Sequence, residues 1–247
     1  MIPQIFMTNC KILELQKQLI HFMIKVYATK IDSDAITTER NEFFHKHYKK
    51  QQLIFNPSQS LKNLQGSTGN FLIRHILSAN FGCDLQTLSI VLDSYGKPYC
   101  PSARQIYFSI SHSDKWVVCA LDCELIGIDI QKIISIPQNR MDSIVLRFFH
   151  KCEQIQYFNL ADDEKKTFFF TQWTLKESYI KLMGNGLGIG LQNFSVFLDH
   201  NGNGSMDYEG SIYYFRQYII DQNYKLVVCS LNNSFPQSIE NISFPPQ

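Results

Sequence analysis

The chain has 247 residues, which is enough for one large domain or two smaller ones with a substantial hydrophobic core. Its hydrophobic fraction of 45% and charged fraction of 18% are typical of an ordinary soluble globular protein. The formal net charge of +1 excludes a general polyanion-binding surface, so we expect no nucleic-acid partner, and any anion site must be local.

Cysteine use and hydropathy both favour a cytoplasmic protein. The seven cysteines are odd in number, scattered, and without a Cys-x-x-Cys pair, which is typical of reduced cysteines in the cytosol. No apolar run approaches the roughly 18 residues that a membrane span needs. The N-terminus also lacks the features of a secretory signal. We therefore expect a cytoplasmic location and no membrane partner.

The first half of the chain alternates strand-like and helix-like patterns. The helix expected at 61–77 is interrupted by Gly66 and Gly69. The other elements expected in this half are a strand at 22–27, a helix at 38–53, and strands at 88–92, 105–110, 116–121 and 126–130.

The second half follows a similar plan. Helices are expected at 141–149, 152–159 and 163–183. The last of these begins with acidic residues and ends at Gly184, with Lys181 in its final turn, as helix ends prefer. Strands are expected at 194–198, 212–219 and 224–230, the first two joined by a turn at 201–204, and a disordered tail follows.

Each half thus has one helical stretch and about three strands, although no residue-level repeat accompanies this doubling. We expect an α+β fold of two similar subdomains, a pseudo-twofold duplication in which helices pack on a small, mostly antiparallel sheet. The N-terminal subdomain is placed at 1–124, the C-terminal subdomain at 125–234, and the tail at 235–247.

Two short stretches carry the most distinctive polar side chains. On a helix, Trp173, Glu177 and Lys181 share one face. On a strand, Asp129 and Gln131 also share a face. Oxygen ligands near a lysine suit a hard divalent cation that holds a phosphate ester. Purely structural roles are also possible for these residues. Asp129 and Gln131 could lie on an exposed strand edge, and Trp173 could be a core residue. Glu177 and Lys181 could form a surface ion pair, which stabilises a helix by about 0.2–0.5 kcal/mol.

A third stretch adds candidate phosphate donors. Residues 95–99 read Tyr-Gly-Lys-Pro-Tyr, a turn that fixes Lys97 on a rigid loop. Residues 108–113 read Phe-Ser-Ile-Ser-His-Ser, which places Ser111 and His112 directly after a strand, where hydroxyl and imidazolium groups can donate to phosphate oxygens. Alternatively, His112 is an ordinary loop histidine.

In this order, the motifs Tyr-Gly-Lys-Pro, Phe-Ser-Ile-Ser-His-Ser, Gly-Ile-Asp-Ile-Gln at 127–131 and Trp-Thr-Leu-Lys-Glu-Ser-Tyr-Ile-Lys at 173–181 resemble those of 4′-phosphopantetheinyl transferases of the surfactin-synthetase-activating (Sfp) type. The likeness covers roughly residues 85–230. It implies an enzyme that transfers the phosphopantetheine arm of coenzyme A (CoA) to a serine of acyl, peptidyl or aryl carrier proteins and releases adenosine 3′,5′-bisphosphate. CoA would lie between the CoA-binding N-terminal half and the metal-binding, catalytic C-terminal half.

The resemblance also implies residue roles. Asp129, Gln131 and Glu177 would surround Mg²⁺, or Mn²⁺ in its place, bridging the pyrophosphate. Glu177 would be the general base for the carrier serine, and Lys181 would stabilise or protonate the departing phosphate. The residues expected to bind CoA are Lys97, Pro98, Ser111, His112, Lys176 and Lys181. The apolar residues Leu187, Ile189 and Leu191 would contact the carrier, or else belong to the core.

Two departures from the family pattern are visible. Position 131 is glutamate in many members and glutamine here, so we expect weaker metal affinity. Segment 64–70 lacks the basic residue that contacts the CoA 3′-phosphate, and Ser67, Thr68, Lys49 or Lys50 are candidate substitutes. A non-catalytic CoA- or carrier-binding relative is therefore the main alternative, followed by another Mg²⁺-dependent phosphotransferase. Internal doubling suggests a monomer.

Overall fold

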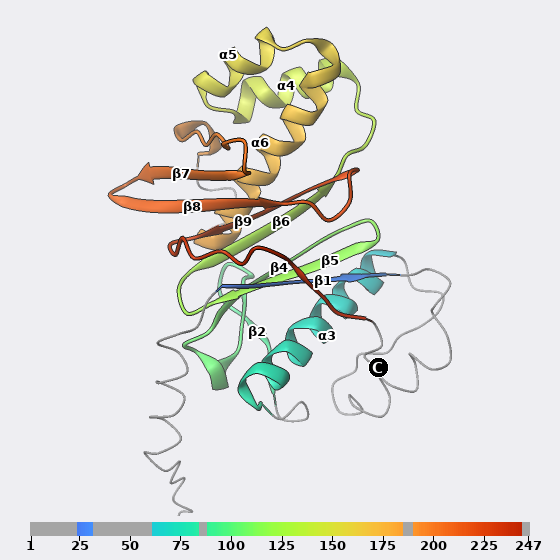
Figure 1. The fold of residues 1–247 in the computed structure, drawn as a ribbon, viewed down its shortest axis with the longest axis vertical. Coiled ribbons are helices and arrows are strands. Elements are labelled where there is room, and N and C mark those ends of the chain that lie inside the picture. The colour runs from blue at the N-terminus through green and yellow to red at the C-terminus, as the bar shows by residue number, and fades with distance from the viewer. Residues whose placement is uncertain (1–23, 32–60, 84–87, 185–189, 244–247) are drawn as a thin grey trace, which may run out of the picture.

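The computed structural model describes residues 24–31, 61–83, 88–184 and 190–243, and its centre is a pair of four-stranded sheets (Figure 1). The first sheet has the order β10-β1-β5-β4 and the second β6-β9-β8-β7. Their strands are β1 (Lys25–Lys30), β4 (Tyr107–Ser113), β5 (Trp116–Asp122), β6 (Ile126–Lys132), β7 (Asn203–Tyr208), β8 (Ser211–Tyr218), β9 (Tyr224–Ser230) and β10 (Glu240–Asn241). All ladders in these sheets are antiparallel except β1–β10.

Helices flank the sheets on their outer sides. The described helices are α3 (Leu61–Phe81), α4 (Gln138–Phe148), α5 (Lys151–Asn159) and α6 (Asp162–Met183), with short 3₁₀ turns at Pro101–Ala103 and Leu191–Asn193. Helix α3 packs on the first sheet, α6 packs on the second, and α4 and α5 pack against α6 (Figure 1). A small hairpin of β2 (Val91–Leu92) and β3 (Pro98–Tyr99) stands beside β4. The expected α+β class with mostly antiparallel sheets is confirmed.

Strand alternation explains how the layers form. Successive side chains of a strand point to opposite faces. In β5, Val117 and Cys119 pack toward α3, whereas Val118 and Ala120 pack between the two sheets. Strand β9 behaves in the same way, with Val228 between the sheets and its neighbours toward α6. Apolar side chains on both faces therefore produce four layers, with α3 and α6 outermost.

Several predicted boundaries are wrong. Helix α3 runs without a break, because Gly66 and Gly69 both lie inside it; Gly69 allows α3 to approach β4, since a Cβ there would lie 3.1 Å from Ile110 Cγ2. Strand β1 lies three residues later than predicted, and β4 extends through Ser113, so the Ser-His-Ser motif lies within the strand. The helix expected at 38–53 lies outside the described residues.

The C-terminal third also differs from expectation. Residues 194–198 form no strand; the chain turns at Asp199 and then forms β7, whose sequence Asn-Gly-Ser-Met-Asp-Tyr has no apolar alternation. The hairpin turn lies at Glu209 and Gly210, both with positive φ. Residues 240–241, expected to be disordered, pair with β1. None of the helices in the described part of the chain is long and apolar enough to cross a membrane.

Candidate active site

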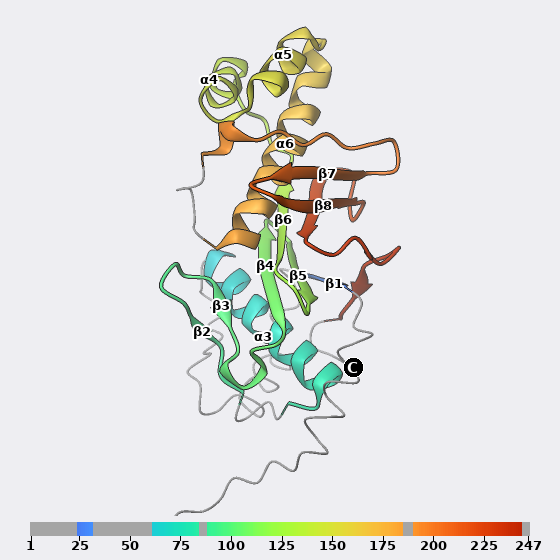
Figure 2. The same cartoon turned by 90° about the vertical axis from the view of Figure 1, so that its left-hand side faces the viewer.

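Helix α6 and strand β6 approach each other unusually closely at Gly127. A Cβ at this position would lie 2.0 Å from the carbonyl oxygen of Ser178 and 2.5 Å from the backbone nitrogen of Leu182. No real side chain tolerates such distances, so glycine allows the helix to rest directly on the strand. In Figure 2, α6 runs alongside β6 and ends next to β4. The last turns of α6 thereby face the residues of β6 that follow Gly127.

Four polar side chains from three elements meet at this contact. Lys181 Nζ of α6 lies 2.6 Å from both Asp129 Oδ1 of β6 and Ser111 Oγ of β4. The Ser111 hydroxyl donates to Asp129 Oδ1 at 2.9 Å, and Gln131 Nε2 donates to Asp129 Oδ2 at 2.9 Å. Asp129 is only 2% exposed, so it is not a residue of an exposed strand edge. Lys181 forms an ion pair with the buried Asp129, so the alternative of a simple surface ion pair with Glu177 does not describe it.

Glu177 lies one turn before Lys181 on the same helix and is half-buried. Burial raises the pKa of its carboxyl group, the negative charge of Asp129 raises it further, and Lys181 lowers it. The two carboxylates are thus close enough for their charges to interact. This is the arrangement of like charges that a bound cation relieves.

The oxygen atoms around Asp129 are suitable ligands for a hard divalent cation. Asp129 and Glu177 offer carboxylate oxygens, and Gln131, whose Nε2 is directed at Asp129, retains its carbonyl oxygen. Mg²⁺ prefers oxygen ligands and needs only one or two carboxylates from the protein. Within the described residues, no group of three His, Cys, Asp or Glu side chains is assembled that could hold a metal ion. A cation here would therefore rely on two carboxylates and one amide.

A row of serines joins β4 to β6. The Oγ atoms of Ser109, Ser111 and Ser113 accept hydrogen bonds from the backbone N–H groups of Ile128, Ile130 and Lys132. Sequence reasoning named Ser111 as a CoA contact and did not anticipate that these serines bond to β6, although their alternation is visible in the sequence. We call these three residues the serine row. It holds Ser111 beside Asp129 and fixes the first sheet against the second.

Lys97 lies at the C-terminal end of α6, where the β2–β3 hairpin touches it. Its ammonium donates to the carbonyl oxygen of Leu182 at 2.7 Å. Burial lowers the pKa of Lys97 to about 8, and Asp93 opposes this shift. The Asp93 carboxylate builds the turn itself by accepting from the N–H groups of Tyr95 and Lys97.

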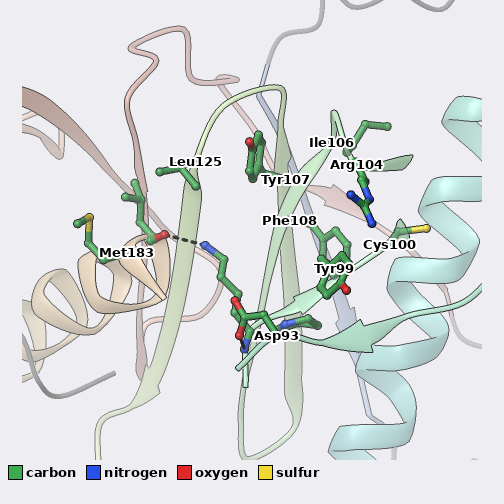
Figure 3. A pocket seen from close by; sticks show the side chains of 12 residues that line it. Asp93, Tyr99, Cys100, Arg104, Ile106, Tyr107, Phe108, Leu125 and Met183 are labelled. Atoms are coloured by element: carbon green, nitrogen blue, oxygen red, sulfur yellow. Dashed lines mark hydrogen bonds between the residues drawn. The ribbon is translucent and has the colours of Figure 1, made fainter. Parts of the chain in front are cut away.

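Two cavities meet at Lys97. One of about 240 Å³ is lined by Lys97, Pro98 and Lys181, three of the residues expected to bind CoA, together with Ser109. The other, of about 450 Å³, is also lined by Lys97 and Pro98, with aromatic side chains such as Tyr99 and Tyr107 around it (Figure 3). The structure therefore brings Lys97, Pro98, Ser111 and Lys181 to one region between β3, β4 and α6.

The expectation that Lys176 holds CoA phosphates is wrong. Its side chain is 1% exposed, and its ammonium forms an ion pair with Glu153 Oε2 at 2.8 Å. It also donates to the carbonyl oxygens of Leu191 and Phe194 and lies 4.4 Å from the centre of the Phe194 ring. All three donors are thus occupied inside the protein. Glu153 is the partner that sequence reasoning missed.

The remaining predicted residues lie elsewhere. His112 is exposed and lies on the α3 side of β4, because Phe108 and Ile110 on the same face pack with α3. Leu191 is 2% exposed and belongs to the core between α6 and the second sheet, so it is not a docking residue. Leu187, Ile189, Lys49 and Lys50 lie outside the described residues. Thr68 is buried in α3, and Trp173 packs on Phe148 and Phe169 as a core residue.

Comparison with known proteins identifies the family of the chain. Residues 125–229 match the family model of the 4′-phosphopantetheinyl transferase superfamily. The chain is 36% identical to 4′-phosphopantetheinyl transferase Sfp of Bacillus subtilis (strain 168), over 71% of this chain and 78% of that protein. It is 34% identical to another Bacillus subtilis 4′-phosphopantetheinyl transferase, over 83% and 87%. It is 33% identical to 4′-phosphopantetheinyl transferase gsp of Aneurinibacillus migulanus, over 70% of this chain and 71% of that protein. The chain therefore belongs to the 4′-phosphopantetheinyl transferases, and among them to the Sfp type.

Proposed function

We propose that this protein transfers the 4′-phosphopantetheine moiety of CoA to a serine of acyl, peptidyl or aryl carrier proteins. The reaction converts the apo carrier to the holo carrier and releases adenosine 3′,5′-bisphosphate. The observation that carries the proposal is the cluster of Lys181, Asp129 and Ser111 beside Glu177, in a chain whose relatives carry out this class of transfer. The cluster combines carboxylate and hydroxyl oxygens, the ammonium of Lys181, and the Glu177 carboxyl group, whose pKa is raised.

Asp129, Gln131 and Glu177 would hold the divalent cation, Mg²⁺ or Mn²⁺. When bound, the cation supplies Lewis-acid stabilisation of the charge that develops on the pyrophosphate. Glutamine at position 131 adds no negative charge, so the protein's own contribution comes from the two carboxylates. We expect a correspondingly weaker affinity for the metal than a third carboxylate would give.

The chain's own residues would move the protons. The carrier serine oxygen forms a bond to the β-phosphorus while the bond from that phosphorus to the bridging oxygen breaks. Glu177, whose pKa burial raises, accepts the serine proton directly or through water. Lys181 lies next to Asp129 and donates a proton or a hydrogen bond to the departing phosphate. The serine row keeps Ser111 within reach of the same phosphates.

For the coenzyme, Lys97, Pro98, Ser111, His112 and Lys181 remain the proposed contacts. The cavity of about 240 Å³ beside Lys97 and Lys181 is large enough for only part of CoA, so the rest of the coenzyme would extend beyond it. All groups proposed to act in the transfer come from one chain, which favours a monomer.

The test is intact-mass spectrometry of a purified apo-carrier protein incubated with this enzyme, CoA and Mg²⁺. We expect a gain of one phosphopantetheine per carrier, and no gain in EDTA. Asp129→Ala and Glu177→Ala should abolish turnover because each removes a carboxylate of the cluster. Asp163→Ala, which changes an exposed carboxylate at the start of α6, is the matched control and should retain activity.

The outcomes separate the proposal from its alternatives. Full activity of either cluster variant would contradict the assigned roles. Binding of CoA or carrier without any mass gain, across acyl, peptidyl and aryl carriers, would support a non-catalytic relative. A nucleotide-dependent transfer of phosphate from ATP, which an excess of CoA does not inhibit, would instead support a different phosphotransferase.

A further inference from the structure

We propose that a third cavity, separate from the transfer site, binds a small anionic metabolite that carries a carboxylate or phosphate group. The cavity has a volume of about 470 Å³, within the range of small-molecule sites. It shares no lining residue with the two cavities at Lys97. Ligand binding in this cavity would be a function separate from the proposed transfer reaction.

Three parts of the chain that are distant in sequence form this cavity. Trp116 comes from the start of β5 in the first sheet, and Arg216 and Gln217 come from β8 in the second sheet. The C-terminal segment closes it with Gln237 and Ser238. Tyr218 holds that segment in place, because its hydroxyl donates to the carbonyl oxygen of Pro236 at 2.8 Å. A bound molecule would contact both sheets and the C-terminal segment at once.

Two buried donors of the cavity have no acceptor. Among the residues that the structure describes, Trp116 Nε1 and Arg216 Nε are buried side-chain nitrogens without a hydrogen-bond partner. An unsatisfied buried donor costs roughly 1–3 kcal/mol, and most such groups in folded proteins are paired. Both residues line the same cavity, so a single ligand with acceptor oxygens could satisfy the two together after a small adjustment of the walls.

The charge of the lining selects an anion. Among the described residues, Arg216 is the only charged side chain that lines the cavity, and one of its terminal nitrogens already donates to Asn203. In the part of the chain that the structure describes, no carboxylate lines the cavity, and the other polar lining residues include Asn201, Gln237 and Ser238. A guanidinium group surrounded by neutral donors suits a carboxylate or a phosphate. The indole of Trp116 would lie against an apolar part of the same molecule.

Trp116 also provides a direct signal. The chain has two tryptophans, so Trp173→Phe leaves Trp116 as the only indole. In this background we would titrate citrate and, separately, inorganic phosphate at constant ionic strength set with sodium chloride. We expect a saturable change of Trp116 fluorescence with at least one probe, and a rise of the melting temperature of the wild-type protein with the same probe.

Arg216→Gln should weaken the response at least tenfold, whereas Arg140→Gln, which removes an exposed arginine of α4, should leave it unchanged. Trp116→Phe keeps an aromatic ring and removes the Nε1 donor, so it should reduce the melting-temperature shift even where Arg216→Gln folds poorly. Lys181→Met, at the transfer site, should retain the fluorescence response. The absence of a saturable response to both probes, or an equal response in Arg216→Gln, would overturn the proposal. Neither result depends on transferase activity.

Discussion

Lys97 carries a charge that the fold makes sensitive to pH. Because burial lowers its pKa to about 8, its ammonium loses its proton as the pH rises from 7 to 9. If the charged form is the one that binds CoA, the KM for CoA should rise by up to about tenfold over this range, following the charged fraction. Steady-state kinetics at constant ionic strength would measure it. Lys97→Arg keeps its charge at pH 9 and should show a nearly flat profile; an unchanged KM in the wild-type protein would contradict the role.

Gln131 allows a test of the proposed metal site that preserves its shape. Gln131→Glu adds a third carboxylate and removes the Nε2 donor that now bonds to Asp129. We expect a several-fold gain in apparent Mg²⁺ affinity, because charge count tunes such sites. Without metal, repulsion between the carboxylates should lower the melting temperature. Titration of activity with Mg²⁺ measures the affinity, which should increase. Thermal unfolding in EDTA measures the stability without metal, which should decrease.

Spacing paired residues within each element but did not indicate the fate of every lysine. Periods of two and four pair Asp129 with Gln131 on the strand and Glu177 with Lys181 on the helix, whereas the family resemblance was needed to join the two pairs into one expected site. Lys176 lies in the same motif as Lys181, and only tertiary structure directs it toward Glu153. A motif states which residues occur together, whereas burial decides which of them reach a ligand.

At the scale of elements, Lys176 and Glu153 form a buried pair that links α5, α6 and the segment at 191–196. Burial raises the pKa of Glu153 and lowers that of Lys176, so neither charge tolerates the loss of its partner. Lys176→Met should cost about 3–5 kcal/mol of the free energy of unfolding, measured in urea. Glu153→Met combined with Lys176→Met should recover most of it, and Lys166→Met on the same helix is the control.

The same variant tests the corrected role of Lys176. Because Lys176 has a structural role inside the core, Lys176→Met should leave the KM for CoA nearly unchanged in the protein that remains folded. A rise in KM of the size expected for a lost phosphate contact, without loss of stability, would instead restore Lys176 as a CoA-binding residue.

Gly127 sets the distance between α6 and β6. Gly127→Ala places a methyl group against the backbone of α6, so the helix must move away from the strand. We expect a loss of about 1–3 kcal/mol in stability and a lower kcat, because Lys181 and Glu177 move relative to Asp129. The matched control is Gly66→Ala, since a Cβ there has no neighbouring atom within 4 Å. Chemical unfolding and carrier-loading rates measure the two effects.

Elements with strong patterns were predicted well. Strand β9 agrees with its predicted range, β5 and β6 are extended by one or two residues, and α6 ends at Gly184 as its sequence indicates. Strand β7 was missed because its polar sequence has no period of two. The strand expected at 194–198 is irregular: Phe194 and Val196 are buried beside α6 without joining a ladder. Burial alone can mimic a strand pattern.

At the scale of the whole molecule, the doubling of sheet and helix was visible in the order of elements, and the chain passes from one sheet to the other between β5 and β6. What the order could not indicate is the return of the C-terminal segment to the first sheet. β10 has only two residues, and its position depends on packing of Phe235 and Ile239 against the core between the sheets. Such a contact has no local signal.

The serine row has a further consequence for solubility. Strands β4 and β6 are edge strands of their own sheets, and an edge with free N–H groups can pair with another chain and start aggregation. Here the serine hydroxyls of β4 occupy alternate N–H groups of β6, so this edge of the second sheet cannot pair with another chain through them. The opposite edges of the described sheets are the two-residue β10 and the polar β7, both poor templates for strand addition. The three serine side chains that hold Ser111 beside Asp129 therefore also close an edge of the second sheet to strand addition.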